Sequence, residues 1–133
     1  MSEPIEFLDL DDLVELARSL LGDPPPIRDI GLLGSAAARP QTTASGEDAY
    51  PDLVTKAAAL LQSIVNNHAL VDGNKRLGWL AAAVFLELNG IKASRASNED
   101  VYDLVAWIAA SNPDLDEVTG RLRRVVQPRS RRT

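Results

Sequence analysis

Apolar residues recur at three- and four-residue spacing along most of the chain, which is the pattern of amphipathic helices. Segments with the alternating polarity of strands are few. The pattern therefore predicts an all-α protein, a compact bundle of about six helices. The expected helices cover residues 9–21, 29–38, 51–67, 74–88, 98–110 and 114–126.

Caps and helix breakers mark the ends of these segments. Asp9 can cap the first helix and Gly22 can end it. The Asp23-Pro24-Pro25-Pro26 run cannot continue a helix, because proline lacks the amide donor. Pro51 suits the first turn of the third helix. Residues 40–50 are small and polar and predict a loop, which is long enough to suggest a function.

The segment 74–88 is apolar on nearly every side, which is typical of a helix at the centre of a bundle. Gly78 lies inside it, where glycine costs about 1 kcal/mol relative to alanine. A chain of 133 residues is long enough for one buried core. We expect residues 1–126 to form a single domain and residues 127–133 to form a basic, disordered tail.

Charge is distributed unevenly along the chain. Residues 1–120 contain 19 acidic and 8 basic residues, a net charge of −11, and six arginines follow them. A domain that binds nucleic acid directly should carry a basic face, so the acidic body argues against that role. The terminal arginines fit a solvated terminus, or a contact with RNA or an acidic partner.

Cysteine usage and hydropathy bear on the compartment. The chain has no cysteine, which excludes disulfides and thiolate metal sites. Its N-terminus is acidic, whereas a signal peptide begins with basic residues. The apolar run from Leu77 to Leu86 is too short to span a bilayer. We expect a cytoplasmic protein that does not contact membranes.

Residues 68–76 read His-Ala-Leu-Val-Asp-Gly-Asn-Lys-Arg and include the one histidine of the chain. Imidazole changes its protonation state near neutral pH, so His68 is a candidate general base. Asp72 is a hard oxygen ligand of the kind that Mg²⁺ bound to a nucleotide takes. A histidine at a helix end is more often a capping or packing residue, and Asp72 could instead cap the next helix.

The end of this motif looks like an anion site. Gly73 permits backbone angles closed to other residues, and Asn74, Lys75 and Arg76 fall in the first turn of the central helix. Free amides and the helix dipole attract anions there. Two cations oppose the dipole unless a phosphate lies between them, and such local conflicts tend to mark function. The alternative is two solvated bases at a surface corner.

Several other chemistries lack their residues. One histidine and no cysteine exclude the common zinc sites. The sequence has no Walker loop and no G-x-G-x-x-G phosphate loop, and no G-x-S-x-G turn for a serine nucleophile. Nothing in the sequence points to a hydrolase with paired carboxylates, although the sequence does not exclude one.

The pattern His68-x-x-x-Asp72-Gly73-Asn74-Lys75-Arg76 resembles the motif of the death-on-curing (Doc) toxins of the Fic superfamily. This resemblance extends over roughly residues 5–125 and implies the Fic fold, with the motif loop leading into the central helix. It also implies the toxin of a bacterial toxin–antitoxin pair. The other segments that resemble the family include Ile27-Arg28-Asp29, Ala38-Arg39-Pro40, Tyr50-Pro51-Asp52-Leu53, Lys56-Ala57-Ala58 and Phe85-Leu86-Glu87-Leu88-Asn89-Gly90.

The resemblance implies an activity. Doc toxins are protein kinases that transfer the γ-phosphate of ATP to a threonine of elongation factor Tu and halt translation. Most Fic proteins instead transfer AMP, and these have glycine at the position of Lys75, which leaves room for the phosphates of the nucleotide. The lysine of this chain would block the nucleotide orientation used for AMP transfer and would favour the inverted orientation. The implied roles are catalysis by His68, Asp72 and Arg76, Mg²⁺ binding by Asp72, and ATP binding by Gly73, Asn74, Lys75 and Arg76.

The resemblance also implies partners. A cognate Phd-like antitoxin would fold into a groove on the toxin, and nucleic acid would be contacted only through that antitoxin. Residues 41–50 lie where the family has its target-docking flap. Leu70 stands where the family has phenylalanine, and Leu77 and Gly78 stand where it tends to have threonine and alanine. An AMP transferase and a non-catalytic binding protein are the alternatives.

Overall fold

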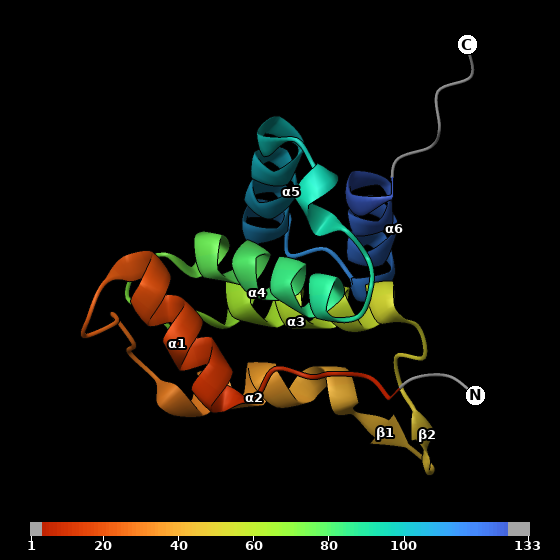
Figure 1. Cartoon of the computed structure of the whole chain (residues 1–133), viewed down its shortest axis with the longest axis horizontal. Coiled ribbons are helices and arrows are strands. Elements are labelled where there is room, and N and C mark those ends of the chain that lie inside the picture. The colour runs from red at the N-terminus through yellow and green to blue at the C-terminus, as the bar shows by residue number, and fades with distance from the viewer. Residues whose placement is uncertain (1–3, 128–133) are drawn as a thin grey trace.

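Six α-helices make up most of the computed structural model, which describes residues 4–127. Helices α3 (Leu53–Asn67) and α4 (Asn74–Leu88) form the middle layer. On one side lie α1 (Leu10–Leu21) and α2 (Ile30–Ala38), and on the other lie α5 (Asn98–Ser111) and α6 (Leu115–Val126) (Figure 1). The predicted all-α class is confirmed. The remaining elements are two 3-10 turns, η1 (Arg39–Gln41) and η2 (Ala93–Arg95), and a hairpin of β1 (Thr43–Ala44) and β2 (Glu47–Asp48).

The predicted tail falls almost entirely outside the described residues, because residues 128–133 are not among them. Within residues 4–127, no helix is both long and apolar enough to cross a membrane.

Side-chain caps fix where most of the helices begin. In five helices the cap oxygen accepts a hydrogen bond from the backbone amide three residues later, which satisfies an amide that has no partner inside the helix. The five caps are Asp9, Asp29, Asp52, Ser97 and Asp114. The predicted start of the third helix at Pro51 is wrong, because Asp52 is the cap and the helix begins at Leu53.

Asp52 has a shifted pKa. Its burial raises the pKa, but hydrogen bonds from Thr55 and from Arg123 outweigh the burial and hold the pKa below its usual value. Arg123 on α6 thereby contacts the N-terminal end of α3, at a distance of 3.1 Å from its Nη2 atom to the Asp52 carboxylate.

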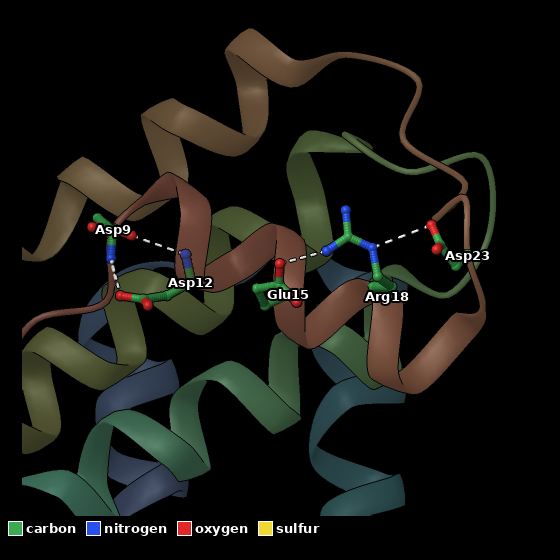
Figure 2. A network of polar contacts seen from close by, with 5 residues as sticks. All are labelled: Asp9, Asp12, Glu15, Arg18 and Asp23. Carbon is green, nitrogen blue, oxygen red and sulfur yellow. Dashed lines mark hydrogen bonds and ion pairs between the residues drawn. The ribbon is translucent and has the colours of Figure 1, made fainter.

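Polar contacts run along the exposed side of α1 (Figure 2). Asp9 and Asp12 form a capping box in which each carboxylate accepts the other residue's amide, both at 2.9 Å. Near the other end, Arg18 donates to Glu15 and to Asp23. Exposed ion pairs of this kind add little stability. The Asp23 contact nevertheless links the end of α1 to the connection that leads to α2.

The core lies between the layers, and α3 is its most completely buried helix. Helix α4 is central, as predicted, but it keeps Trp79 half-buried and Leu88 exposed. The apolar pattern of α3 is interrupted by Lys56 and Ser63, which are buried with polar partners. The apolar pattern of the sequence therefore predicts less burial for α3 than the structure shows. The buried residues of α3 are Val54, Lys56, Ala57, Ala58, Ala59, Leu60, Leu61, Ser63, Ile64 and Val65.

Gly78 allows α3 and α4 to approach closely. A Cβ atom at this position would lie 2.8 Å from Val65 Cγ2 and 3.3 Å from Leu61 Cδ1. Val65 is buried and β-branched, so its side chain cannot easily move aside. The glycine that weakens the helix locally is therefore required by the packing of the two central helices.

We expect Gly78→Ala to destabilise the protein by about 1–2 kcal/mol in urea unfolding. The overpacking cost of roughly 1–3 kcal/mol exceeds the gain of about 1 kcal/mol in helix propensity. Gly120→Ala in α6 is the matched control, because its new Cβ would have Arg124 Nη1 as nearest neighbour, at 3.9 Å. The control should gain up to about 1 kcal/mol. A stabilised Gly78→Ala variant would contradict the packing argument.

Candidate active site

Helix α3 ends at His68, which adopts a left-handed conformation with φ 58° and ψ 43°. Residues other than glycine rarely adopt these angles, although histidine does so more often than most. The turn reverses the chain direction between α3 and α4. It also leaves the imidazole exposed on the rim of a pocket, not packed in the core.

The loop after His68 is anchored in the core by Leu70, which is 2% exposed. Its backbone pairs with the connection between α1 and α2. The amides of Arg28 and Asp29 donate to the Ala69 carbonyl at 2.8 and 3.0 Å, and the Val71 amide donates to the Pro26 carbonyl at 2.9 Å. This loop is therefore held by strand-like backbone contacts as well as by its buried leucine.

Asn74 closes the loop from the other side. Its side-chain oxygen accepts from the Leu70 amide and its side-chain nitrogen donates to the Leu70 carbonyl, both at 3.0 Å. Both polar groups of the side chain are thus engaged within the loop. The predicted contact of Asn74 with phosphate accordingly depends on its backbone amide, in the first turn of α4, where helix geometry provides no partner.

Gly73 is required at its position for two independent reasons. Its φ of 93° lies in the left-handed region, where a side chain would be strained. An added Cβ would also lie 2.8 Å from the Cδ atoms of Leu21, the last residue of α1. The glycine therefore allows the start of α4 to pack closely against the last residue of α1.

Asp72 does not cap α4 with its side chain. The cap position is Gly73, and the helix has no side-chain cap. One carboxylate oxygen of Asp72 accepts the Gly73 amide at 2.9 Å, and the side chain is exposed. No side chain among residues 4–127 donates to Asp72 in this structure. Asp72 therefore has a carboxylate oxygen that accepts no hydrogen bond from residues 4–127.

A pocket of about 440 Å³ contains all of the predicted site residues. Lys75 and Arg76 are exposed on its wall, and within the described residues neither forms an ion pair. Their charges add to the positive end of the α4 dipole, so the pocket favours an anion. The residues that line it are Val65, His68, Val71, Asp72, Gly73, Asn74, Lys75, Arg76 and Ala109.

The pocket offers a metal ion one carboxylate, that of Asp72. Among residues 4–127, no three histidine, cysteine, aspartate or glutamate side chains lie close enough to hold a metal together. Mg²⁺ commonly uses one protein carboxylate when phosphate oxygens and water provide its other ligands. The donor set therefore fits a magnesium ion that enters with a nucleotide.

Sequence reasoning missed four contributors to the site, and one of them is Val65, a buried residue of α3. Ala109 comes from α5, and Val71 is an apolar residue of the motif loop that is 72% exposed. Arg28 donates a side-chain hydrogen bond to the His68 carbonyl from 40 residues away. Only tertiary packing brings Ala109 and Arg28 to the motif, whereas Val71 lies within the motif itself.

The predicted loop at residues 40–50 overlaps the end of η1 and contains the β1–β2 hairpin, which turns at Ser45 and Gly46. Lys56 on α3 is 1% exposed and donates to the Asp48 carboxylate at 3.1 Å and to the Tyr50 carbonyl. Lys56 lies 12 residues before His68, or about 18 Å along the helix. The hairpin is thus attached at the end of α3 that is remote from the imidazole (Figure 1).

A polar hollow of about 480 Å³ extends along α3 between these two points. It includes Thr42 near the hairpin and Asn67 next to His68. Arg39 lies on its wall and is fixed by hydrogen bonds to Gln62 and Ser63, at 2.7 and 3.0 Å, and by its position over the Tyr50 ring. The hollow thus provides a polar surface along α3 that begins near the hairpin and ends at Asn67, the residue before His68.

We expect Lys56→Met to destabilise the protein by about 1–2 kcal/mol and to increase amide exchange in residues 42–50. The change leaves the Tyr50 carbonyl without its donor and removes the partner of Asp48. The cost stays moderate because Asp48 is 57% exposed and water can solvate it. Urea unfolding and hydrogen exchange measure the two effects. Lys92→Met, at an exposed lysine, is the control, and equal behaviour of both variants would refute the prediction.

Comparisons with known proteins agree with the motif. The profile of the Fic/DOC family matches residues 7–86, a range that includes every predicted site residue. A protein named "Toxin Doc" from Mycolicibacterium smegmatis (strain ATCC 700084 / mc(2)155) is 47% identical over 118 residues. That alignment covers 88% of this chain and 91% of the relative.

Proposed function

This chain belongs to the Fic/DOC family, and on that premise we propose that it is the toxin of a toxin–antitoxin pair that transfers the γ-phosphate of ATP to a protein hydroxyl. The name of its relative, "Toxin Doc", supports the role of toxin. The pocket at the start of α4 is the observation that carries the proposed chemistry, because one cavity contains a base, a carboxylate and two cations.

The nucleotide's phosphates bind at the first turn of α4. Lys75 and Arg76 provide charge, and the free backbone amides of this turn provide hydrogen-bond donors. At the position of Lys75 this chain resembles the phosphate-transferring branch of the family, which has lysine. The AMP-transferring branch has glycine at the same position. This difference favours a nucleotide that presents its terminal phosphate to His68.

Asp72 would hold the magnesium ion that accompanies the nucleotide. Bound there, the ion would neutralise charge on the phosphate oxygens. The carboxylate is suited to this because the side chain is exposed, one oxygen is oriented by the Gly73 amide, and the other accepts no hydrogen bond from residues 4–127.

His68 acts as the general base. Its imidazole accepts the proton of the incoming hydroxyl as the hydroxyl oxygen bonds to the γ-phosphorus and the bond from that phosphorus to the bridging oxygen breaks. ADP leaves with the electron pair of the broken bond. Arg76 stabilises the charge that is spread over the phosphoryl oxygens during transfer.

The protein substrate is a threonine of elongation factor Tu, as the resemblance to Doc toxins implies. The segment that carries the threonine lies in the polar hollow between the hairpin and His68, and the hairpin serves as its docking flap. The protein acts in the cytoplasm, where this factor is found. A Phd-like antitoxin neutralises the toxin, and contact with nucleic acid occurs through that antitoxin.

Isotope position distinguishes kinase from AMP transferase. The chain is incubated with elongation factor Tu, Mg²⁺ and ATP labelled at either the α- or the γ-phosphate, and the factor is weighed by mass spectrometry. The proposal predicts γ-label and one added phosphate. Retained α-label and one added AMP would establish the alternative on the same fold. Absence of both labels, together with growth arrest in cells, would favour a non-catalytic toxin.

A further inference from the structure

We propose that Arg28 is a positioning residue for His68, acting through the backbone and not through the imidazole. This inference rests on the proposed function, in which His68 is the base. The assignment of Arg28 comes from the contacts of the α1–α2 connection with the motif loop, which the family comparison does not describe.

Arg28 holds two consecutive carbonyls of the loop. Its guanidinium donates from Nη2 to the carbonyl oxygen of His68, and its backbone amide donates to the Ala69 carbonyl at 2.8 Å. The neighbouring Ile27 pairs with Leu70 in an isolated bridge. The connection and the loop therefore align as two short antiparallel segments, with the arginine side chain extending that alignment by one residue.

The His68 carbonyl needs such a partner. His68 is the C-terminal cap of α3, where the last carbonyls have no amide donor inside the helix. Its left-handed backbone is intrinsically disfavoured for a residue with a side chain. A cation hydrogen-bonded to the end of a helix also suits the negative end of its dipole. Arg28 thus stabilises the peptide orientation that directs the imidazole to the pocket rim.

An ordinary surface role does not account for Arg28. The residue is exposed, yet it forms no ion pair with a carboxylate within residues 4–127. The adjacent Asp29 is used as the cap of α2. By contrast, Arg18 and Arg123 each pair with carboxylates. The His68 carbonyl is therefore the contact that fixes the Arg28 side chain.

The test compares Arg28→Met and Arg28→Lys with Arg123→Met in the full, untagged chain. Arg123 is a matched control because it is also exposed and contacts the opposite end of α3, through Asp52. Labelling with ¹³C,¹⁵N-histidine gives one set of signals, since the chain has one histidine. The Cα chemical shift of His68 then reports its backbone conformation independently of any activity.

The expected result is a changed His68 Cα shift in Arg28→Met, with kcat for phosphate transfer lowered about tenfold or more and KM for MgATP within about twofold. Arg28→Lys should recover part of both, because lysine can still donate to the carbonyl. Arg123→Met should match the wild type in both readouts. An imidazole that is only misdirected lowers kcat without weakening the nucleotide site.

An unchanged His68 shift in Arg28→Met would overturn the proposal, as would an unchanged kcat in an active protein. Loss of folding in both Arg28 variants would also overturn it, by showing a general structural role. If the wild type transfers no phosphate, the proposed function fails. The chemical shift would still decide whether Arg28 sets the conformation of His68.

Discussion

Substituting asparagine for His68 is expected to lower the rate of phosphate transfer by about 10³-fold, within the range for loss of a general base. Asparagine is the sharpest replacement because it tolerates the left-handed conformation that this position requires. The backbone contacts to Arg28 and the loop should therefore persist. Alanine would combine loss of the base with strain in the turn.

The measurement is single-turnover transfer of γ-labelled phosphate to elongation factor Tu, with binding of MgATP followed separately. Binding should stay within about twofold of the wild type, because in the proposed function the phosphates are held by the first turn of α4 and not by the imidazole. Transfer by His68→Asn at more than a tenth of the wild-type rate would exclude His68 as the base.

Replacing Asp72 by asparagine is expected to lower transfer by roughly 10²–10³-fold and to weaken binding of MgATP. Asparagine can still accept the Gly73 amide with its side-chain oxygen, so the loop keeps its geometry. What disappears is the negative charge that would hold magnesium in the proposed function. A loss of transfer in Asp72→Asn would therefore report the proposed metal contact separately from the hydrogen bond to Gly73.

Calorimetric titration with MgATP, and separately with Mg²⁺ alone, checks this assignment. Mg²⁺ alone should bind weakly to the wild type, because one carboxylate is an incomplete ligand set. MgATP should bind in an Asp72-dependent manner. If Asp72→Asn transferred phosphate at the wild-type rate, the metal assignment would have to move to another group.

The predictable part of the site is the part that is continuous in sequence. His68 to Arg76 are neighbours along the chain, so one turn and the start of one helix bring them into one pocket. Their residue types were sufficient to suggest an anion and a metal. The use of the Asn74 side chain within the loop was not predictable, because it depends on the conformation of Leu70.

The long-range contacts could not be predicted from periodicity. Arg28 meets His68 only after the α1–α2 connection has packed on the loop, and Ala109 reaches the pocket on α5. The requirement for glycine at position 78 could not be predicted from the sequence either. The sequence gives the low helix propensity of glycine but not the position of Val65 beside it.

One local feature could have been interpreted better. The hairpin at residues 43–48 turns at Ser45 and Gly46, and both have positive φ, as a type I′ hairpin turn requires. A Ser-Gly pair is a recognised turn signal. The flanking strands are only two residues long and wholly exposed, so they lack the alternating apolar positions that normally indicate a strand.

The pairing of residues 26–29 with residues 69–71 makes two distant stretches of chain open and close as one cooperative unit. Neither stretch can fray without exposing unpaired amides and carbonyls of the other. A chain in which the first two helices have come loose would therefore retain every motif residue yet lack an assembled pocket. The proposed phosphate transfer would then be lost abruptly on local unfolding instead of declining gradually.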